Sequence, residues 1–179
     1  MLAPCRRAGD TSRCNPMWRL LALPWLIAML ALPLPAAARA YRALVTSVVD
    51  GDTLWVRRSP GDAGIEIRIQ GIDAPEICQR WGLQSRDALR KLLHGRRVKV
   101  DERAHDAYGR VLARLSVDGR DVGGWLVTNG LAWSPGFQHR PGVYAELQAQ
   151  ARDAQRGLWS QPRPLEPRAF RRQHGPCPH

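Results

Sequence analysis

The chain has 179 residues and a mass of 20.0 kDa, a size that suits one domain with a hydrophobic core. Its 27 Lys and Arg residues outnumber 16 Asp and Glu, so the formal net charge is +11 and the pI is near 10.9. This balance favours a polyanionic partner, either nucleic acid or an anionic membrane surface, over an ordinary small-molecule substrate. A hydrophobic fraction of 44% excludes a chain that is mostly disordered.

The first forty residues have the pattern of a signal peptide. An uncharged run of 15 residues, 20–34, follows a basic residue, contains two prolines and is short for a membrane-spanning helix. Ala38 and Ala40 then match the small-residue rule for signal cleavage, and Met17 suits the start of such a leader better than the first methionine. We therefore expect residues 1–40 to direct export to the periplasm or the medium. An uncleaved membrane anchor is the alternative.

Loss of this leader changes both the charge and the cysteine count. It takes away five arginines and one aspartate, and it leaves 22 basic against 15 acidic residues, a net charge of +7. Two cysteines remain, Cys78 and Cys177. In an oxidising compartment they can form a disulfide, but the sequence is equally compatible with two free thiols.

Alternating apolar and polar residues predict about five β-strands. Residues 41–56 are rich in Val, Leu and Thr and are broken by a turn at Asp50-Gly51. The further alternating segments are 65–70, 97–101 and 111–117. In such strands every second side chain faces the core, so the polar residues between them face outward.

Helical spacing of apolar residues predicts three helices. The first lies in 83–93 and ends before Gly95, the second follows Asp121 as its cap, and the third begins near Val143 and ends before Gly157. Together with the strands, this order predicts an α+β domain over 41–160, a five-stranded OB-fold β-barrel with three packed helices. From residue 161 onward, five prolines and four arginines in nineteen residues predict an extended C-terminal tail.

Two acidic clusters lie at predicted strand ends, one at 50–53 and the other at 72–76. Carboxylates together with a backbone carbonyl suit a hard cation such as Ca²⁺, although the spacing does not fit an EF-hand loop. Taken singly, each acid is as well explained as a turn former or a helix cap.

Two arginines, Arg68 and Arg110, fall on the outer faces of predicted strands. Either one alone is typical of an exposed barrel surface. Combined with the acids, they supply what phosphodiester hydrolysis needs. A metal neutralises the phosphate, a carboxylate takes a proton from water, and guanidinium groups stabilise the developing charge.

Three segments resemble, in order, the motifs of the thermonuclease, or staphylococcal nuclease, family. They are VDGDT (49–53), RIQGIDAPE (68–76) and YGR (108–110). GLA (130–132) and GLW (157–159) are similar to its later landmarks, so the resemblance covers most of the chain after the leader.

The resemblance implies a calcium ion as cofactor. Asp52 and Asp73 match the carboxylate ligands of the family, and the carbonyl oxygen of Ala74 matches a backbone ligand. These three residues are therefore the expected metal site.

The resemblance also implies the roles of four further residues. Glu76 matches the general base that activates water, and Arg68 and Arg110 match the phosphate-binding arginines, with Arg110 also helping the departing 5′ oxygen. Tyr108 matches a tyrosine beside the terminal phosphate.

We accordingly expect a monomeric, calcium-dependent nuclease that cleaves DNA and RNA with little sequence specificity, leaves 3′-phosphate ends and needs no stable protein partner. The alternative is a non-catalytic OB-fold module that binds single-stranded nucleic acid. Binding alone requires positive charge, whereas this chain also carries Asp52, Asp73 and Glu76 at the matched positions.

The chain departs from the family pattern near the substrate. Ala107 replaces a phosphate-contacting lysine, and Trp133 and Phe137 follow where base-stacking tyrosines are usual. Either ring can stack on a base or belong to the core, so base preference is left open.

Overall fold

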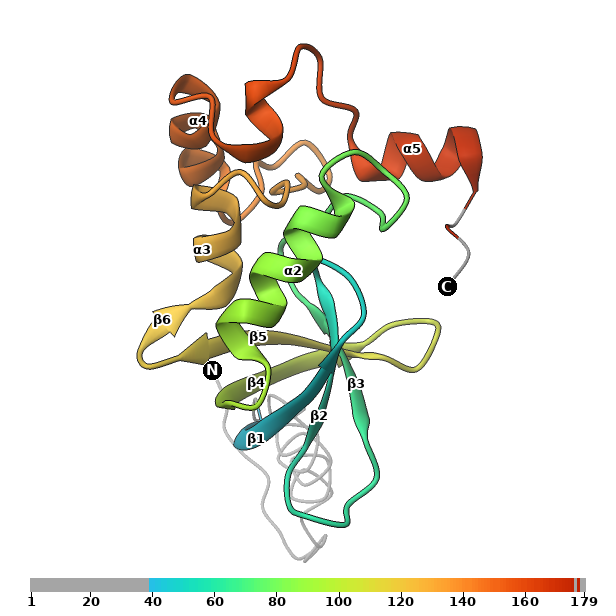
Figure 1. The fold of residues 1–179 in the computed structure, drawn as a ribbon, viewed down its shortest axis with the longest axis vertical. Coiled ribbons are helices and arrows are strands. Elements are labelled where there is room, and N and C mark those ends of the chain that lie inside the picture. Colours follow the sequence, from blue (N-terminus) through green and yellow to red (C-terminus); the bar gives the residue numbers. More distant parts are fainter. Residues whose placement is uncertain (1–38, 176, 178–179) are drawn as a thin grey trace, which may run out of the picture. The chain divides into compact units, whose positions relative to one another are not determined.

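The computed structural model describes residues 39–175 and 177, which belong to one compact unit, Ala38–His179 (Figure 1). The predicted signal peptide, apart from its last two positions, lies outside the described residues. None of the helices within 39–175 is long and apolar enough to cross a membrane.

Five strands close into a barrel, as the sequence predicts (Figure 1). They are β1 (Arg39–Val48), β2 (Thr53–Arg57), β3 (Ile65–Ile69), β4 (Arg97–His105) and β5 (Val111–Val117). Their order in the sheet is β3-β2-β1-β4-β5, with antiparallel neighbours, and a short β6 (Arg120–Asp121) follows β5 at the edge. A parallel pairing of β3 with β5, in which Ile67 lies opposite Val111, closes the barrel.

Alternation along the strands decides which side chains reach the core. Ile67 and Ile69 are buried on either side of Arg68, which therefore lies on the outer face of β3. On β5 the buried residues alternate in the same way from Val111 to Val117. The register places Arg68 opposite Leu112, and Arg110, two residues before Leu112, belongs to the same outer face.

The three predicted helices are present as α2 (Gly82–Leu93), α3 (Val122–Thr128) and α4 (Ala145–Asp153), and they gather at one end of the barrel (Figure 1). As predicted, Asp121 caps α3, because its Oδ1 accepts a hydrogen bond of 2.6 Å from the backbone N–H of Gly124. Gly95 follows α2 with a φ of 74°, a left-handed conformation that glycine adopts without strain.

The prediction of an extended tail is wrong for part of its length. A 3₁₀ helix, η2 (Gly157–Ser160), precedes it, and residues Pro167–His174 form a fourth helix, α5, that lies across α2 from α3 and α4 (Figure 1). Pro167 occupies the first turn of α5, where its fixed φ suits the helix and its missing N–H costs nothing. Pro167 therefore marks the start of a helix within the predicted tail.

Candidate active site

The turn between β1 and β2 positions the first carboxylate of the site. Oδ1 of Asp50 accepts hydrogen bonds from the backbone N–H groups of Asp52 and Thr53, at 2.8 and 2.7 Å, so Asp50 is a turn former. Asp52 points inward and is only 2% exposed. A Cβ on the intervening Gly51 would lie 2.6 Å from Cβ of Ala74, so the turn packs directly on the second acidic cluster.

The loop after β3 positions the second carboxylate. The backbones of Asp73 and Trp133 exchange two hydrogen bonds, of 3.0 and 2.9 Å, and Asp73 is 6% exposed. The N–H of Ala74 donates a hydrogen bond of 2.9 Å to Oδ2 of Asp52. Backbone contacts thus bring the two acidic clusters together.

Arg68 joins the two carboxylates from the outer face of β3. Its Nη1 donates to Oδ1 of Asp52 and its Nη2 to Oδ1 of Asp73, both at 2.8 Å. Burial raises the pKa of Asp52 to about 7, although the charge of Arg68 opposes this rise. The pKa of Arg68 itself lies above its usual value, because Asp52 and Asp73 outweigh the effect of burial.

The two carboxylates fit a divalent cation by the chemistry of their donors. Asp52 and Asp73 both bind the guanidinium group of Arg68, so a single positive group reaches both carboxylates. The atoms that these two side chains offer to a metal are all oxygens, which hard cations such as Ca²⁺ prefer. Within residues 39–175 and 177, no group of three or more His, Cys, Asp and Glu side chains is placed to hold a metal ion. A cation here therefore needs ligands besides these two side chains, such as a backbone carbonyl, water or a phosphate oxygen.

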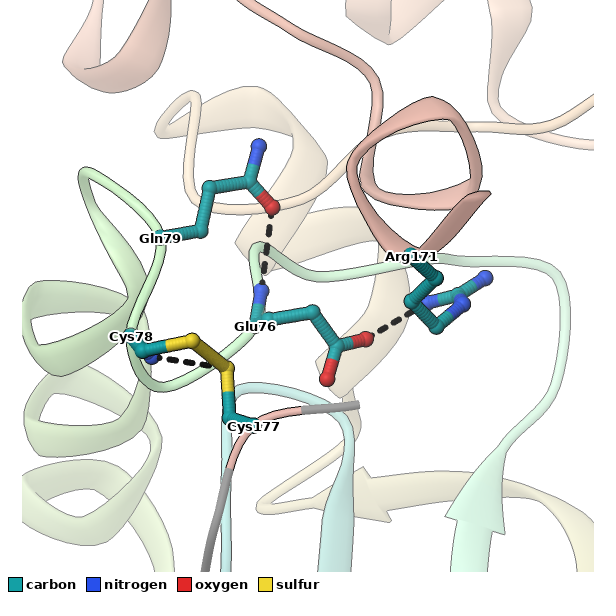
Figure 2. The surroundings of a disulfide bond; sticks show 5 residues. All are labelled: Glu76, Cys78, Gln79, Arg171 and Cys177. Carbon is teal, nitrogen blue, oxygen red and sulfur yellow. Dashed lines mark hydrogen bonds and ion pairs between the residues drawn. A yellow bond between two sulfur atoms is a disulfide. The ribbon is translucent and has the colours of Figure 1, made fainter. Parts of the chain in front are cut away.

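Glu76 lies three residues after Asp73 and contacts an arginine of α5 (Figure 2). Nη1 of Arg171 donates to Oε1 of Glu76 at 2.6 Å and to Oδ1 of Asp73 at 3.1 Å, while its Nη2 donates to Oδ2 of Asp73 at 3.0 Å. Burial works against the charge of Arg171, but the two carboxylates outweigh it and raise its pKa. All three acids of the predicted site thus belong to one ion-pair network with Arg68 and Arg171.

Arg110 and Tyr108 form a separate part of the site. Nε of Arg110 donates to Oδ2 of Asp106 at 2.8 Å, and its backbone N–H donates to Oδ1 at 3.0 Å. Tyr108, in the same turn, is 86% exposed. Among the described residues no ion pair joins Arg110 to Asp52, Asp73 or Glu76; the strand register alone puts it on the face of Arg68.

A model of the staphylococcal nuclease homologue family matches residues 66–161, more than half of the chain. The sequence is 38% identical over 128 residues to an uncharacterized endonuclease of Escherichia coli, a match that covers 71% of this chain and 82% of the relative. It is 33% identical over 143 residues to a micrococcal nuclease of Shigella flexneri, covering 74% and 81% of the two chains. An uncharacterized endonuclease of Haemophilus influenzae is 33% identical over 130 residues, 72% of each chain.

The chain belongs to the staphylococcal nuclease family. The resemblance seen in the sequence is confirmed, and so is the enzyme class, a phosphodiesterase that acts on nucleic acid. These findings favour the enzyme over the binding module.

Two residues of this candidate site are absent from the sequence prediction. Asp106 holds Arg110 in place by accepting its hydrogen bond. The sequence signal for Asp106 is a common turn pattern, with Asp at the first and Gly at the fourth position of 106–109. Arg171 binds Asp73 and Glu76, although the composition of 161–179 predicts an extended tail there. Its signal was the helical spacing of arginines after Pro167, together with the two cysteines.

The open alternatives at Cys78 and Trp133 are resolved. Cys78 and Cys177 form a disulfide, with Cα atoms 5.8 Å apart (Figure 2). The Trp133 ring packs edge-on against Trp159, with centroids 4.4 Å apart, and belongs to a small apolar cluster. Phe137 is 74% exposed, so of the two candidate stacking rings it is the accessible one.

Proposed function

We propose that this nuclease is calcium-dependent, cleaves the P–O5′ bond of DNA and RNA with little sequence specificity and leaves 3′-phosphate ends. The observation that carries the proposal is the convergence of Asp52 and Asp73 from two loops on Arg68, with Glu76 joined to the same network. The family resemblance of these positions supports the finer details.

Asp52, Asp73 and the carbonyl oxygen of Ala74 are the proposed holders of the calcium ion. When bound, the ion supplies positive charge that neutralises a phosphate oxygen and favours attack at phosphorus. The two buried carboxylates supply negative charge, and this charge favours the exchange of water ligands of the ion for carboxylate oxygens.

The chain's own side chains account for the remaining steps. Glu76 accepts a proton from the attacking water, for which its Oε2, the oxygen not bonded to Arg171, is the available acceptor. Arg68 donates hydrogen bonds to the phosphate oxygens. Arg110 stabilises the charge on the departing 5′ oxygen, and Tyr108, in the same exposed turn, lies beside the terminal phosphate.

Weak sequence specificity follows from the kind of groups in the site. Carboxylates and arginines recognise the phosphate backbone, which is the same at every position of DNA and RNA. Phe137 offers a surface for stacking, an interaction that every base can make. The excess of arginine adds affinity for the backbone that falls with salt.

We further propose that the protein is exported and acts as a monomer in the periplasm or the medium. The uncharged run at 20–34 and the small residues after it support export, and an anchor formed by the same segment is the alternative. The disulfide is consistent with an oxidising compartment.

Digestion of plasmid DNA and of an RNA transcript tests the proposal. Calcium should give complete digestion, and a chelator should leave both substrates intact. The products should carry 5′-hydroxyl ends, so an exonuclease that requires a 5′-phosphate should not degrade them. A 3′-phosphatase should release phosphate from their other ends. Intact substrate with calcium, from a folded protein, contradicts the proposed function, and digestion in chelator contradicts the calcium dependence.

A further inference from the structure

The guanidinium of Arg171 contacts two of the three acids of the proposed site, Asp73 and Glu76. It forms hydrogen bonds with both carboxylate oxygens of Asp73 and with Oε1 of Glu76, and its side chain is 34% exposed. Two hydrogen bonds to one carboxylate make the strongest geometry that arginine forms with an acid. Arg171 has no role in the proposed catalytic steps.

The helix that carries Arg171 is attached to the Glu76 loop at both ends. Before α5, Nε2 of Gln79 donates a hydrogen bond of 2.7 Å to the carbonyl oxygen of Leu165. After α5, Cys177 is bonded to Cys78, whose N–H also contacts the partner sulfur at 3.1 Å (Figure 2). Cys78 lies only two residues after Glu76, so the disulfide fixes α5 directly beside the acids.

We propose that α5 is an autoinhibitory element in which Arg171 competes with the divalent cation for Asp73. The disulfide between Cys78 and Cys177 keeps this competitor at the site. The inference rests on the proposed calcium dependence and adds to it a built-in limit on calcium binding.

The competition follows from the charges. A guanidinium group does not lose its proton at any ordinary pH, so Arg171 releases Asp73 only by moving away. Tethering by the disulfide gives it a high effective concentration at the carboxylates. Because such coupling is reciprocal, a bound cation must in turn weaken the contact that holds α5.

Calcium titration of the full chain by calorimetry tests the inference directly. R171Q, whose shorter side chain is still polar but carries no charge, should bind calcium about tenfold more tightly than the wild type. The C78S/C177S double variant should shift in the same direction, since α5 then leaves the site more easily. R172Q is the matched control, because Arg172 is an exposed neighbour on α5 and should bind calcium as the wild type does.

Amide hydrogen exchange gives a second measurement that needs no variant. In the wild-type protein, saturating calcium should speed exchange in residues 167–174, because the cation displaces Arg171.

In the calorimetric titrations, each variant is compared at a temperature below its own Tm, with circular dichroism as the check on folding.

Each outcome decides between two failures. Equal calcium affinity in wild type and R171Q, or an equal gain in R172Q, overturns the inference and leaves the proposed function standing. Unchanged or slower exchange in α5 with calcium also overturns it. Absence of calcium binding in the wild type and in every variant overturns the inference and the calcium-dependent function together.

Discussion

The backbone N–H of Ala74 donates a hydrogen bond of 2.9 Å to Oδ2 of Asp52, although 22 residues separate them in the chain. The contact exists because Gly51 has no side chain, which lets the first turn lie against the second loop. The position of one proposed ligand is thus set by the backbone beside the other.

Replacing Gly51 by alanine should therefore weaken both the fold and the site. The added Cβ would lie 2.6 Å from Cβ of Ala74 and 2.8 Å from Cβ of Ser85, so the turn must move away. Crowding of this kind costs about 1–3 kcal/mol of unfolding free energy. Urea unfolding should show this loss, together with weaker calcium binding; an unchanged free energy of unfolding would mean that the turn has room to spare.

Glu76→Gln should reduce turnover while leaving DNA binding largely intact. Glutamine keeps the shape of the side chain but does not accept a proton from water, and loss of a general base costs about 10²–10⁴-fold. Single-turnover cleavage and chelator-containing binding assays measure the two effects. Glu146→Gln on α4 is the control and should be fully active, because Glu146 is exposed and no ion pair among the described residues joins it to Arg68 or Arg171. Full activity of Glu76→Gln would exclude Glu76 as the base.

Arg110→Ala should lower kcat, because the proposed role of Arg110 is to stabilise charge that develops during cleavage. A rise in KM alone would reassign the residue to substrate binding. Removal of a phosphate contact should also decrease the slope of log affinity against log salt concentration by about one. Arg114→Ala removes an exposed arginine of β5 and should leave kcat unchanged.

The buried Asp52 makes the metal-free protein sensitive to pH. Its pKa is about 7 in the folded chain against 3.8 for an ordinary aspartate, so between these values the folded state binds more protons than the unfolded state. The contribution of Asp52 to the free energy of unfolding is fully present below about pH 4 and is lost as the pH rises through about 7.

Asp52→Asn consequently should raise the stability of the chelated protein more at pH 8 than at pH 4. Thermal melts at the two pH values, for the variant and the wild type, measure the difference. Equal changes at both pH values would show that Asp52 titrates in its ordinary range.

Local patterns in the sequence predicted the strands and three helices well. The fault-free alternation of Ile65, Ile67 and Ile69 identified both β3 and the outer face that carries Arg68. The acid at 121 and the glycine at 95 marked helix ends that the structure confirms. In each case the deciding interaction is between residues close in the chain.

The missing parts of the site depend on contacts between distant residues. Arg171 lies 95 positions from Glu76 and 98 from Asp73, and no periodicity reports such a pairing. The cysteines carried the required information, since a bridge to Cys78 must bring the tail to the Glu76 loop. The composition of residues 161–179 instead favours an extended tail, although Pro167 begins α5.

The parallel pairing of β3 with β5, which closes the barrel, also bears on when a newly made chain becomes an active nuclease. Arg68 on β3 and Arg110 before β5 come onto one face only when these two strands meet, although α2 and β4 lie between them in the chain. Pairing between distant segments is slow, because closing the loop between them costs entropy before the new contacts compensate for it. A chain in which β3 and β5 are not yet paired lacks this common face, so newly made protein should not cleave nucleic acid before the barrel has closed.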